Sequence, residues 1–121
     1  MAYLDCYVRV STKEQLEDGD SVANQISIGK KIANKLKLKF RLRNEGAKSS
    51  TTVTYRDELE ALKQDIKEGK CKNIWALDRS RMFRDMIESM VFRSDYLEKY
   101  KVNLYEGAFG AEVKFRDENE F

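Results

Sequence analysis

Arginine and serine side chains gather in two short segments of this sequence. The first is YVRVSTKEQ, residues 7–15, in which Arg9 and Ser11 stand two positions apart at the end of an apolar run. The second is RSRMFRD, residues 79–85, which contains three arginines. Planar guanidinium groups match the oxygens of a phosphate. Such a group of arginines near a serine hydroxyl predicts a phosphate-binding site.

The chain has no histidine, which excludes several common kinds of chemistry. Ser-His-Asp and Cys-His catalysis both need an imidazole. Two distant cysteines, Cys6 and Cys71, cannot supply the four ligands of a structural zinc site, so no metal is expected. Both cysteines stand in strand-like runs, and we expect them to be reduced core residues.

Length and charge indicate one domain without a strong electrostatic bias. The chain has 121 residues, with 23 Lys and Arg against 21 Asp and Glu, a net charge of +2. This balance neither requires nor excludes a nucleic acid partner. The sequence lacks an apolar run of membrane-spanning length and the layout of a signal peptide, so we expect a cytoplasmic protein with no membrane contact.

Strand-like and helical patterns alternate along the chain. A helix begins at Ser21, a second is headed by Thr54 and stopped by Gly69, and a third spans 85–99 and is expected to bury Ile87, Met90, Val91 and Leu97. This alternation predicts an α/β fold with a mostly parallel central sheet flanked by helices. The strand-like runs are 4–10, 37–43, 72–78 and 102–105, and 111–115 could add a fifth strand.

The two arginine segments should meet at one edge of the predicted sheet. Each follows a strand, and ligands of such sheets bind beyond the carboxyl ends of the strands. We therefore expect Arg9, Arg79, Arg81 and Arg84 to converge near Ser11, with an anion between them. The alternative for each arginine is an ordinary surface ion pair. Another basic stretch lacks acids from Ser21 to Asn44, and it is either a solvated face or a DNA contact.

The segment YVRVSTKEQ resembles the YxRVSTxxQ opening of the serine recombinases, the resolvase and invertase group. RMFRD, placed between a strand and an amphipathic helix, is similar to the R-x-x-R-(D/N) element of the same family. The resemblance covers essentially the whole chain and implies the flavodoxin-like layering of the resolvase catalytic domain. Two long connections, EDGDS and 45–54, resemble the large serine recombinases more than the small resolvases.

The resemblance also implies roles for individual residues. Ser11 would attack a DNA phosphodiester, giving a 5′-phosphoserine link and a free 3′-hydroxyl, with neither metal nor ATP as cofactor. Three arginines would hold the phosphate and stabilise its charge, namely Arg9, Arg81 and Arg84. Supporting contacts would come from Arg56, Gln15 and Gln25.

One position departs from the family pattern. The family commonly has aspartate directly before the first arginine of the pair, and this chain has Ser80 there. Asp78 stands two residues earlier, so either Asp78 acts from a shifted position or Ser80 takes the role less well.

The resemblance implies that residues 1–121 form the catalytic domain, without the long dimerisation helix and the DNA-binding domain that normally follow it. The implied partners are double-stranded DNA and further copies of the chain, as dimers and tetramers of the full-length protein. Recombination or transposition is the leading hypothesis. The alternatives are a catalytically silent DNA- or phosphate-binding module, and a regulatory domain that binds a small phosphate compound. The sequence specifies neither the DNA target nor the direction of the reaction.

Overall fold

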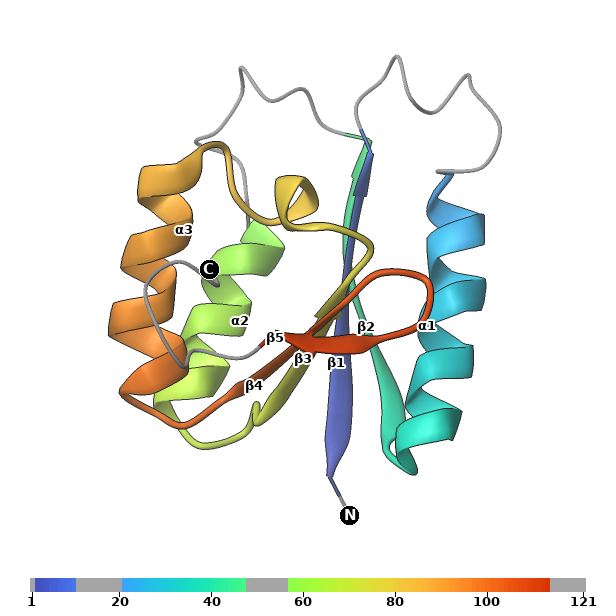
Figure 1. Cartoon of the computed structure of the whole chain (residues 1–121), viewed down its shortest axis with the longest axis horizontal. Helices are drawn as coiled ribbons and strands as arrows, with labels where there is room; N and C mark the ends of the chain where they lie inside the picture. The colour runs from blue at the N-terminus through green and yellow to red at the C-terminus, as the bar shows by residue number, and fades with distance from the viewer. Residues whose placement is uncertain (1, 11–20, 48–56, 114–121) are drawn as a thin grey trace.

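The computed structural model describes residues 2–10, 21–47 and 57–113 of the chain. A five-stranded sheet lies between two helical layers, with α1 on one face and α2, α3 and η4 on the other (Figure 1). The sheet order is β2-β1-β3-β4-β5. The strands are β1 (Tyr3–Val10), β2 (Lys39–Ala47), β3 (Asn73–Ala76), β4 (Asn103–Glu106) and β5 (Ala111–Val113). The helices are α1 (Val22–Leu36), α2 (Asp57–Lys67), the 3-10 turn η3 (Arg79–Arg81), α3 (Met86–Phe92) and the π-helical η4 (Arg93–Glu98).

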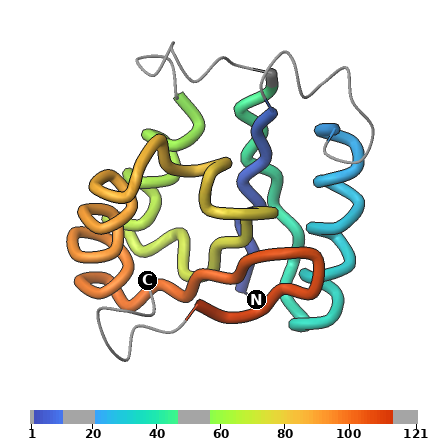
Figure 2. The backbone as a smooth tube through the Cα atoms, turned by 45° about the horizontal axis from the view of Figure 1, so that its top comes forward, coloured from blue at the N-terminus to red at the C-terminus, as the bar shows by residue number. Residues whose placement is uncertain are grey.

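The predicted α/β fold with a mostly parallel sheet is confirmed. Strands β1 to β4 pair in parallel, and β5 is antiparallel to β4. The tube view shows β1 running through the middle of the molecule between the two helical layers (Figure 2). Because β1 and β3 are covered on both faces, their side chains are buried at nearly every position, as the apolar runs in the sequence predicted.

The core has two parts, one on each face of the sheet. Trp75, Leu4 and Cys6 pack with α1 on one face. Tyr7 and Ile74 pack with α2, α3 and η4 on the other. Both cysteines are free and buried, and burial raises the pKa of each thiol. The prediction that they are core residues is therefore confirmed.

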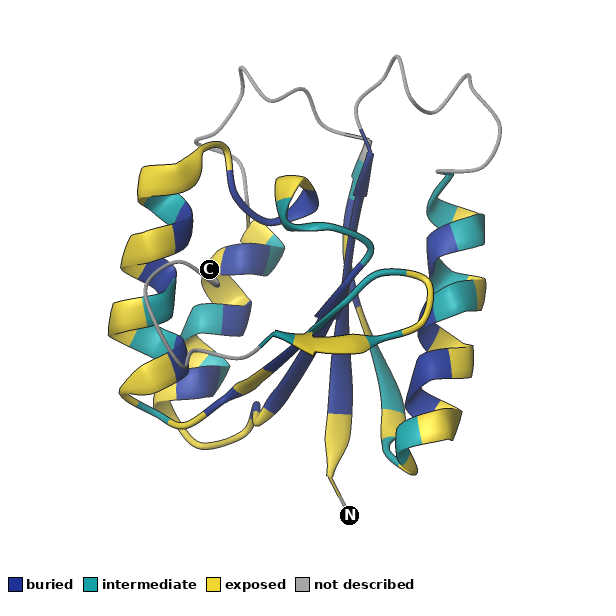
Figure 3. Cartoon of the chain, in the orientation of Figure 1, coloured by how far each residue is buried: buried dark blue, intermediate teal, exposed yellow. Residues whose placement is uncertain are grey.

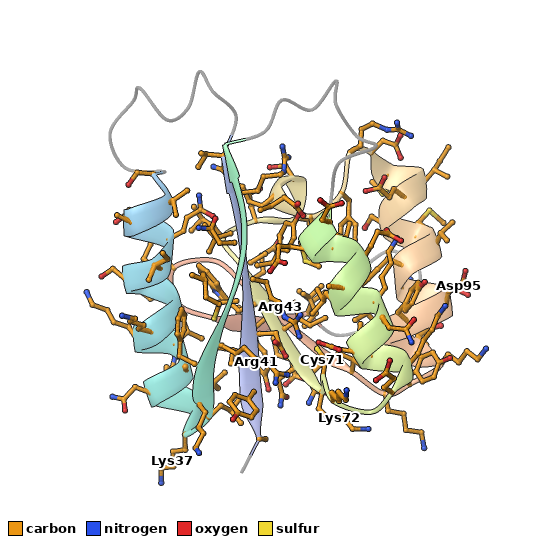
Figure 4. All side chains as sticks on the ribbon, turned by 180° about the vertical axis from the view of Figure 1, so that it is seen from behind. Lys37, Arg41, Arg43, Cys71, Lys72 and Asp95 are labelled. Carbon is orange, nitrogen blue, oxygen red and sulfur yellow. The ribbon has the colours of Figure 1, made fainter. Side chains whose placement is uncertain are left out.

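Strand β2 lies at the edge of the sheet, and two arginines of its basic face form buried or partly buried ion pairs. Arg41 Nε donates to Asp5 Oδ1 at 2.6 Å, and Arg43 Nε donates to the same oxygen at 2.9 Å. Arg43 also pairs with Asp65 of α2. The two arginines thus tie the edge strand to β1 and to α2, as Figure 4 shows from behind.

The third predicted helix is present as α3 followed by η4, but the expected buried face is wrong. Ile87, Met90 and Val91 are 73%, 54% and 51% exposed, and only Leu97 of the expected set is buried (Figure 3). Phe92 takes the inward position instead, 5.1 Å between ring centroids from both Phe83 and Tyr96. A large aromatic ring fills the space against α2, so the aliphatic side chains face outward.

Candidate active site

Arg9 and Arg81 contact each other at the carboxyl end of β1. Both residues are largely buried, with 9% and 5% exposed. Arg9 donates from Nε to the carbonyl oxygen of Arg81 at 2.9 Å, and from Nη2 to that of Ser80 at 2.7 Å. Arg81 Nη1 donates to the carbonyl oxygen of Arg9 at 3.4 Å. The ends of β1 and β3, where the sequence placed its two arginine segments, therefore meet.

Two guanidinium groups this close repel each other, and nearby dipoles offset the repulsion. The three backbone carbonyl oxygens point their negative ends at the cations, and the Asp78 carboxylate lies 3.6 Å from Arg81 Nε. An arginine has five N–H donors in a planar fork. A pair held in this way is preorganised for an anion, because its orientation is fixed by protein groups before a ligand arrives.

Gln25 supports the same strand end from the other face of the sheet. Ser21 begins α1 by accepting a hydrogen bond from the backbone N–H of Asn24 at 3.1 Å, a standard N-cap. The first turn that follows buries Gln25 completely. Its Nε2 donates to the carbonyl oxygen of Arg9 at 3.3 Å, so Gln25 fixes the backbone of β1 one residue before the strand ends.

Asp78 and Ser80 form one hydrogen-bonded unit beside Arg81. The Asp78 side chain caps the turn η3 by accepting from the backbone N–H of Ser80 at 2.9 Å, and the Ser80 hydroxyl also donates to this carboxylate. The sequence left open whether Asp78 or Ser80 occupies the place of the family aspartate. The structure brings the two side chains together, with the carboxylate reaching Arg81 across one turn.

The other two arginines of the second segment do not join this pair. Arg79 lies against Glu106 at the end of β4, with its backbone N–H and its Nε donating to Glu106 Oε2 at 2.9 and 3.1 Å. A neighbouring carboxylate therefore binds Arg79, which also lines the surface hollow beside Ser80, and its convergence on Ser11 stays a prediction because Ser11 lies outside the described residues. Arg84 has an exposed side chain with Nε 3.5 Å from Asp85 Oδ2. It lines a surface hollow of about 360 Å³ together with Ser80.

Glu45 is a buried carboxylate at this edge that the sequence did not single out. Its Oε2 accepts hydrogen bonds from the Tyr7 hydroxyl at 2.9 Å and from the backbone N–H of Leu59 at 3.1 Å. The register of β1 with β2 shifts here, so that Glu45 is the additional residue of a bulge, and Gly46 adopts a positive φ of 79°. Glu45 thereby links β1, β2 and the first turn of α2.

Sequence comparison decides the family of this chain. The model of the resolvase N-terminal domain matches residues 5–119. The chain belongs to the resolvase family. Its members are recombinases, and the resemblance that began with YVRVSTKEQ is confirmed over nearly the whole length of this resolvase-family domain. No curated protein sequence matches it.

Solved structures resemble the fold of this resolvase-family domain. The N-terminal catalytic domain of TP901-1 integrase is 20% identical, with a TM-score of 0.78 over 92% of this chain and 82% of that one. A resolvase-family site-specific recombinase from Streptococcus pneumoniae is 22% identical, with a TM-score of 0.69 over 98% of this chain and 80% of the other. At these identities the likeness is one of fold.

Three of the predicted site residues, Ser11, Gln15 and Arg56, lie outside the described residues. The described residue before Ser11 is Val10, at the end of β1, and the one after Arg56 is Asp57, which begins α2. Within the described ranges, no group of three acidic or cysteine side chains could hold a metal ion. None of the helices described is long and apolar enough to cross a membrane.

Proposed function

We propose that this resolvase-family domain cuts and rejoins DNA strands through a covalent link to Ser11. The observation that carries the proposal is the mutual hydrogen bonding of Arg9 and Arg81 next to the end of β1. Ser11 follows Arg9 by two residues in the sequence, and in our proposal both side chains serve the same phosphate. A phosphodiester held by this arginine pair would lie beside the nucleophile.

The proposed step is balanced in bonds and protons. The Ser11 hydroxyl loses its proton as Oγ forms a bond to phosphorus, and the 3′ oxygen of the DNA gains a proton as its bond to phosphorus breaks. The product is a 5′-phosphoserine and a free 3′-hydroxyl. The energy of the phosphodiester is kept in the covalent link, so the reverse step needs neither ATP nor metal.

Arginine supplies the stabilisation that histidine gives elsewhere. A serine hydroxyl is a weak nucleophile until a neighbouring group takes its proton or stabilises the developing charge. In our proposal Arg9 and Arg81 hold the equatorial phosphate oxygens. The exposed Arg84 completes the site when DNA is bound, and so does Arg56. Gln25 keeps the strand end in place, and Gln15 supports it. In the proposal, the Asp78–Ser80 pair beside Arg81 takes the role of the family aspartate and assists protonation of the leaving oxygen.

Double-stranded DNA is the proposed substrate, and strand exchange requires dimers and tetramers of the full-length protein in the cytoplasm. The test uses the domain within its full-length parent or fused to a DNA-binding module, with a nicked cognate site. A denaturing gel should show a protein–DNA adduct at the DNA 5′ end that Ser11→Ala abolishes. An adduct that survives this substitution would overturn the proposal.

A catalytically silent DNA-binding module is the second candidate. Ser80 in the place of the family aspartate favours it, because a serine is a poorer proton donor than a carboxylic acid. Under this alternative the Ser11→Ala variant binds DNA as the wild type does, and neither protein forms an adduct. Restoring the aspartate with Ser80→Asp would then be the variant that gains an adduct.

A further inference from the structure

Lysines gather at the amino ends of the strands, opposite the arginine pair at the carboxyl ends. At this end of the sheet the chain passes three times from a helix into a strand, and at each passage it carries two lysines with one residue between them. All six lysines are exposed. We call this set the lysine row, and its members are Lys37, Lys39, Lys70, Lys72, Lys99 and Lys101.

The topology brings the three connections into line. They precede β2, β3 and β4, and these strands lie in the order β2-β1-β3-β4. With strands about 4.8 Å apart, the lysine row is about 14 Å wide. Figure 4 shows Lys37 and Lys72 projecting from the same end of the molecule. The residues between the lysines point inward, as the buried Cys71 does.

The lysine row has few acidic neighbours. Lys70 Nζ lies 2.9 Å from Glu68 Oε1, the ion pair found for these six lysines within the described parts of the chain. Lys39 and Lys99 lie over the rings of Tyr3 and Tyr100 at 5.9 and 5.6 Å. Lysine near a helix C-terminus is favourable by itself, because it complements the helix dipole. That effect does not account for the lysines beyond the helix ends, such as Lys39 and Lys72.

Two members of the lysine row occupy backbone positions that favour glycine. Lys37 has φ 60° and Lys101 has φ 56°, in the left-handed region. The α2–β3 connection has Gly69 at the matching position, with φ 77°. In each connection the residue that follows donates its N–H back to the last helical turn, at 2.8 to 2.9 Å. A left-handed side chain other than glycine costs about 1–2 kcal/mol. Lysine therefore stands at both positions at the expense of stability.

We propose that the lysine row binds the phosphate backbone of duplex DNA without sequence preference. A polyanion with regularly spaced charges fits an exposed row of cations better than a compact anion does. This DNA must be a different segment from the one at Ser11. The eight residues of β1 span about 26 Å, and this length separates the lysine row from the arginine pair. One straight duplex therefore cannot contact both ends of the strands. The proposal goes beyond strand cleavage and adds a second DNA-binding surface to the domain.

The test measures binding of the domain to a labelled duplex with no recombination site, by fluorescence anisotropy from about 0.02 to 0.2 M salt. The lysine-row variant is Lys37→Gly, Lys72→Gln and Lys101→Gly. Its two glycines relieve backbone strain, so a loss of binding cannot be caused by unfolding. The matched control removes three positive charges outside both the lysine row and the basic stretch of residues 21–44, with Lys63→Gln, Lys67→Gln and Arg93→Gln.

The lysine-row variant should bind at least about tenfold more weakly at 0.1 M salt, and its slope of log affinity against log salt should fall by about 2 to 3. The control should stay within about threefold of the wild type. Equal losses in both variants, or no binding by the wild type at low salt, would each overturn the proposal. A Ser11→Ala domain should bind this duplex normally, so failure here is distinct from failure of the proposed cleavage.

Discussion

The side chain of Arg9 is bound to the backbone of Arg81, and the side chain of Arg81 is bound to the backbone of Arg9. Each arginine therefore fixes the position of the other. Neither side chain could move toward a ligand without breaking its own hydrogen bond to the backbone of the other. Arginine side chains on an ordinary surface are exposed, whereas both of these are buried at the carboxyl ends of the strands.

Arg81→Lys should abolish most of the proposed chemistry. Lysine keeps the positive charge but lacks the planar fork of N–H donors. That fork lets Arg81 reach the Arg9 carbonyl oxygen and also match the oxygens of a phosphate. Losing one preorganised donor costs about 3 to 4 kcal/mol, so cleavage should slow by a factor of about 10² to 10³. The measurement is single-turnover adduct formation on a nicked site. Arg79→Lys is the control, and it should stay within about threefold because Arg79 binds Glu106. Equal losses in the two variants would contradict the assignment.

The sequence predicted the sheet and the meeting of Arg9 with Arg81 because both depend on local patterns. Alternating apolar runs identify strands, and parallel strands must place their carboxyl ends at one edge. The position of Gln25 followed from the family motif, and the structure brings it to the Arg9 carbonyl.

Other features depended on contacts between residues far apart in the chain. Arg79 was expected in the site, but its partner Glu106 lies 27 positions away on β4. The face of α3 was assigned from aliphatic periodicity, whereas ring packing by Phe92 decided it. Glu45 was read as the start of a polar loop. Its spacing of four residues from Arg41 and two from Arg43 is the signal that placed it on the inner face of the strand.

Glu45→Gln should destabilise the fold and weaken cleavage together. The amide keeps one acceptor oxygen but turns an NH₂ group toward donors, including the backbone N–H of Glu58 at 3.3 Å. A buried donor left without an acceptor costs about 1 to 3 kcal/mol. Urea unfolding should show this loss. Tyr7→Phe should cost less, about 1 kcal/mol, because the carboxylate keeps its backbone partners. If the losses of unfolding free energy from Glu45→Gln and Tyr7→Phe add fully in the double variant, the hydrogen bond between Tyr7 and Glu45 contributes nothing to stability.

Asp5 should make stability depend on pH. Burial raises the pKa of Asp5, but hydrogen bonds from Arg41 and Arg43 outweigh it, and the pKa lies below its ordinary value. A lowered pKa in the folded state stabilises the protein fully above the unfolded value of about 3.9, and this contribution is lost as the pH falls through the folded pKa. Asp5→Asn should cost about 1 to 3 kcal/mol at pH 7, because Arg41 and Arg43 lose their bonds to a charged carboxylate while Arg43 keeps its ion pair with Asp65.

The difference in unfolding free energy between wild type and Asp5→Asn should therefore shrink below about pH 4. Urea titrations between pH 7 and pH 3 measure it. Asp95→Asn removes an exposed carboxylate and should stay within about 0.5 kcal/mol of the wild type throughout. A difference that is constant with pH would show that Asp5 stabilises the fold by packing and not by charge.

Gly110→Ala should be more damaging than Gly107→Ala. Both glycines have positive φ, 66° and 90°, so both substitutions introduce backbone strain. At Gly110 a Cβ would also stand 2.7 Å from Ile32 Cγ2 on α1, whereas at Gly107 the space is open. Gly107→Ala should cost about 1 kcal/mol and Gly110→Ala about 2 to 3 kcal/mol. In thermal unfolding, Gly110→Ala should cost less in an Ile32→Ala background than in the wild type, because the clashing methyl groups are absent there. Equal costs at the two glycines would mean that the loop moves away from α1.

The outward face of α3 gives the sharpest test of the packing in this structure. Periodicity alone predicted that Ile87 and Val91 are buried, and burial of a charge there would cost several kcal/mol. Because both residues are more than half exposed, Ile87→Lys and Val91→Lys should change the unfolding free energy by no more than about 0.5 kcal/mol. Phe92→Ala on the opposite side should cost about 3 to 5 kcal/mol. A large loss for Ile87→Lys with a small one for Phe92→Ala would require that α3 be rotated about its axis.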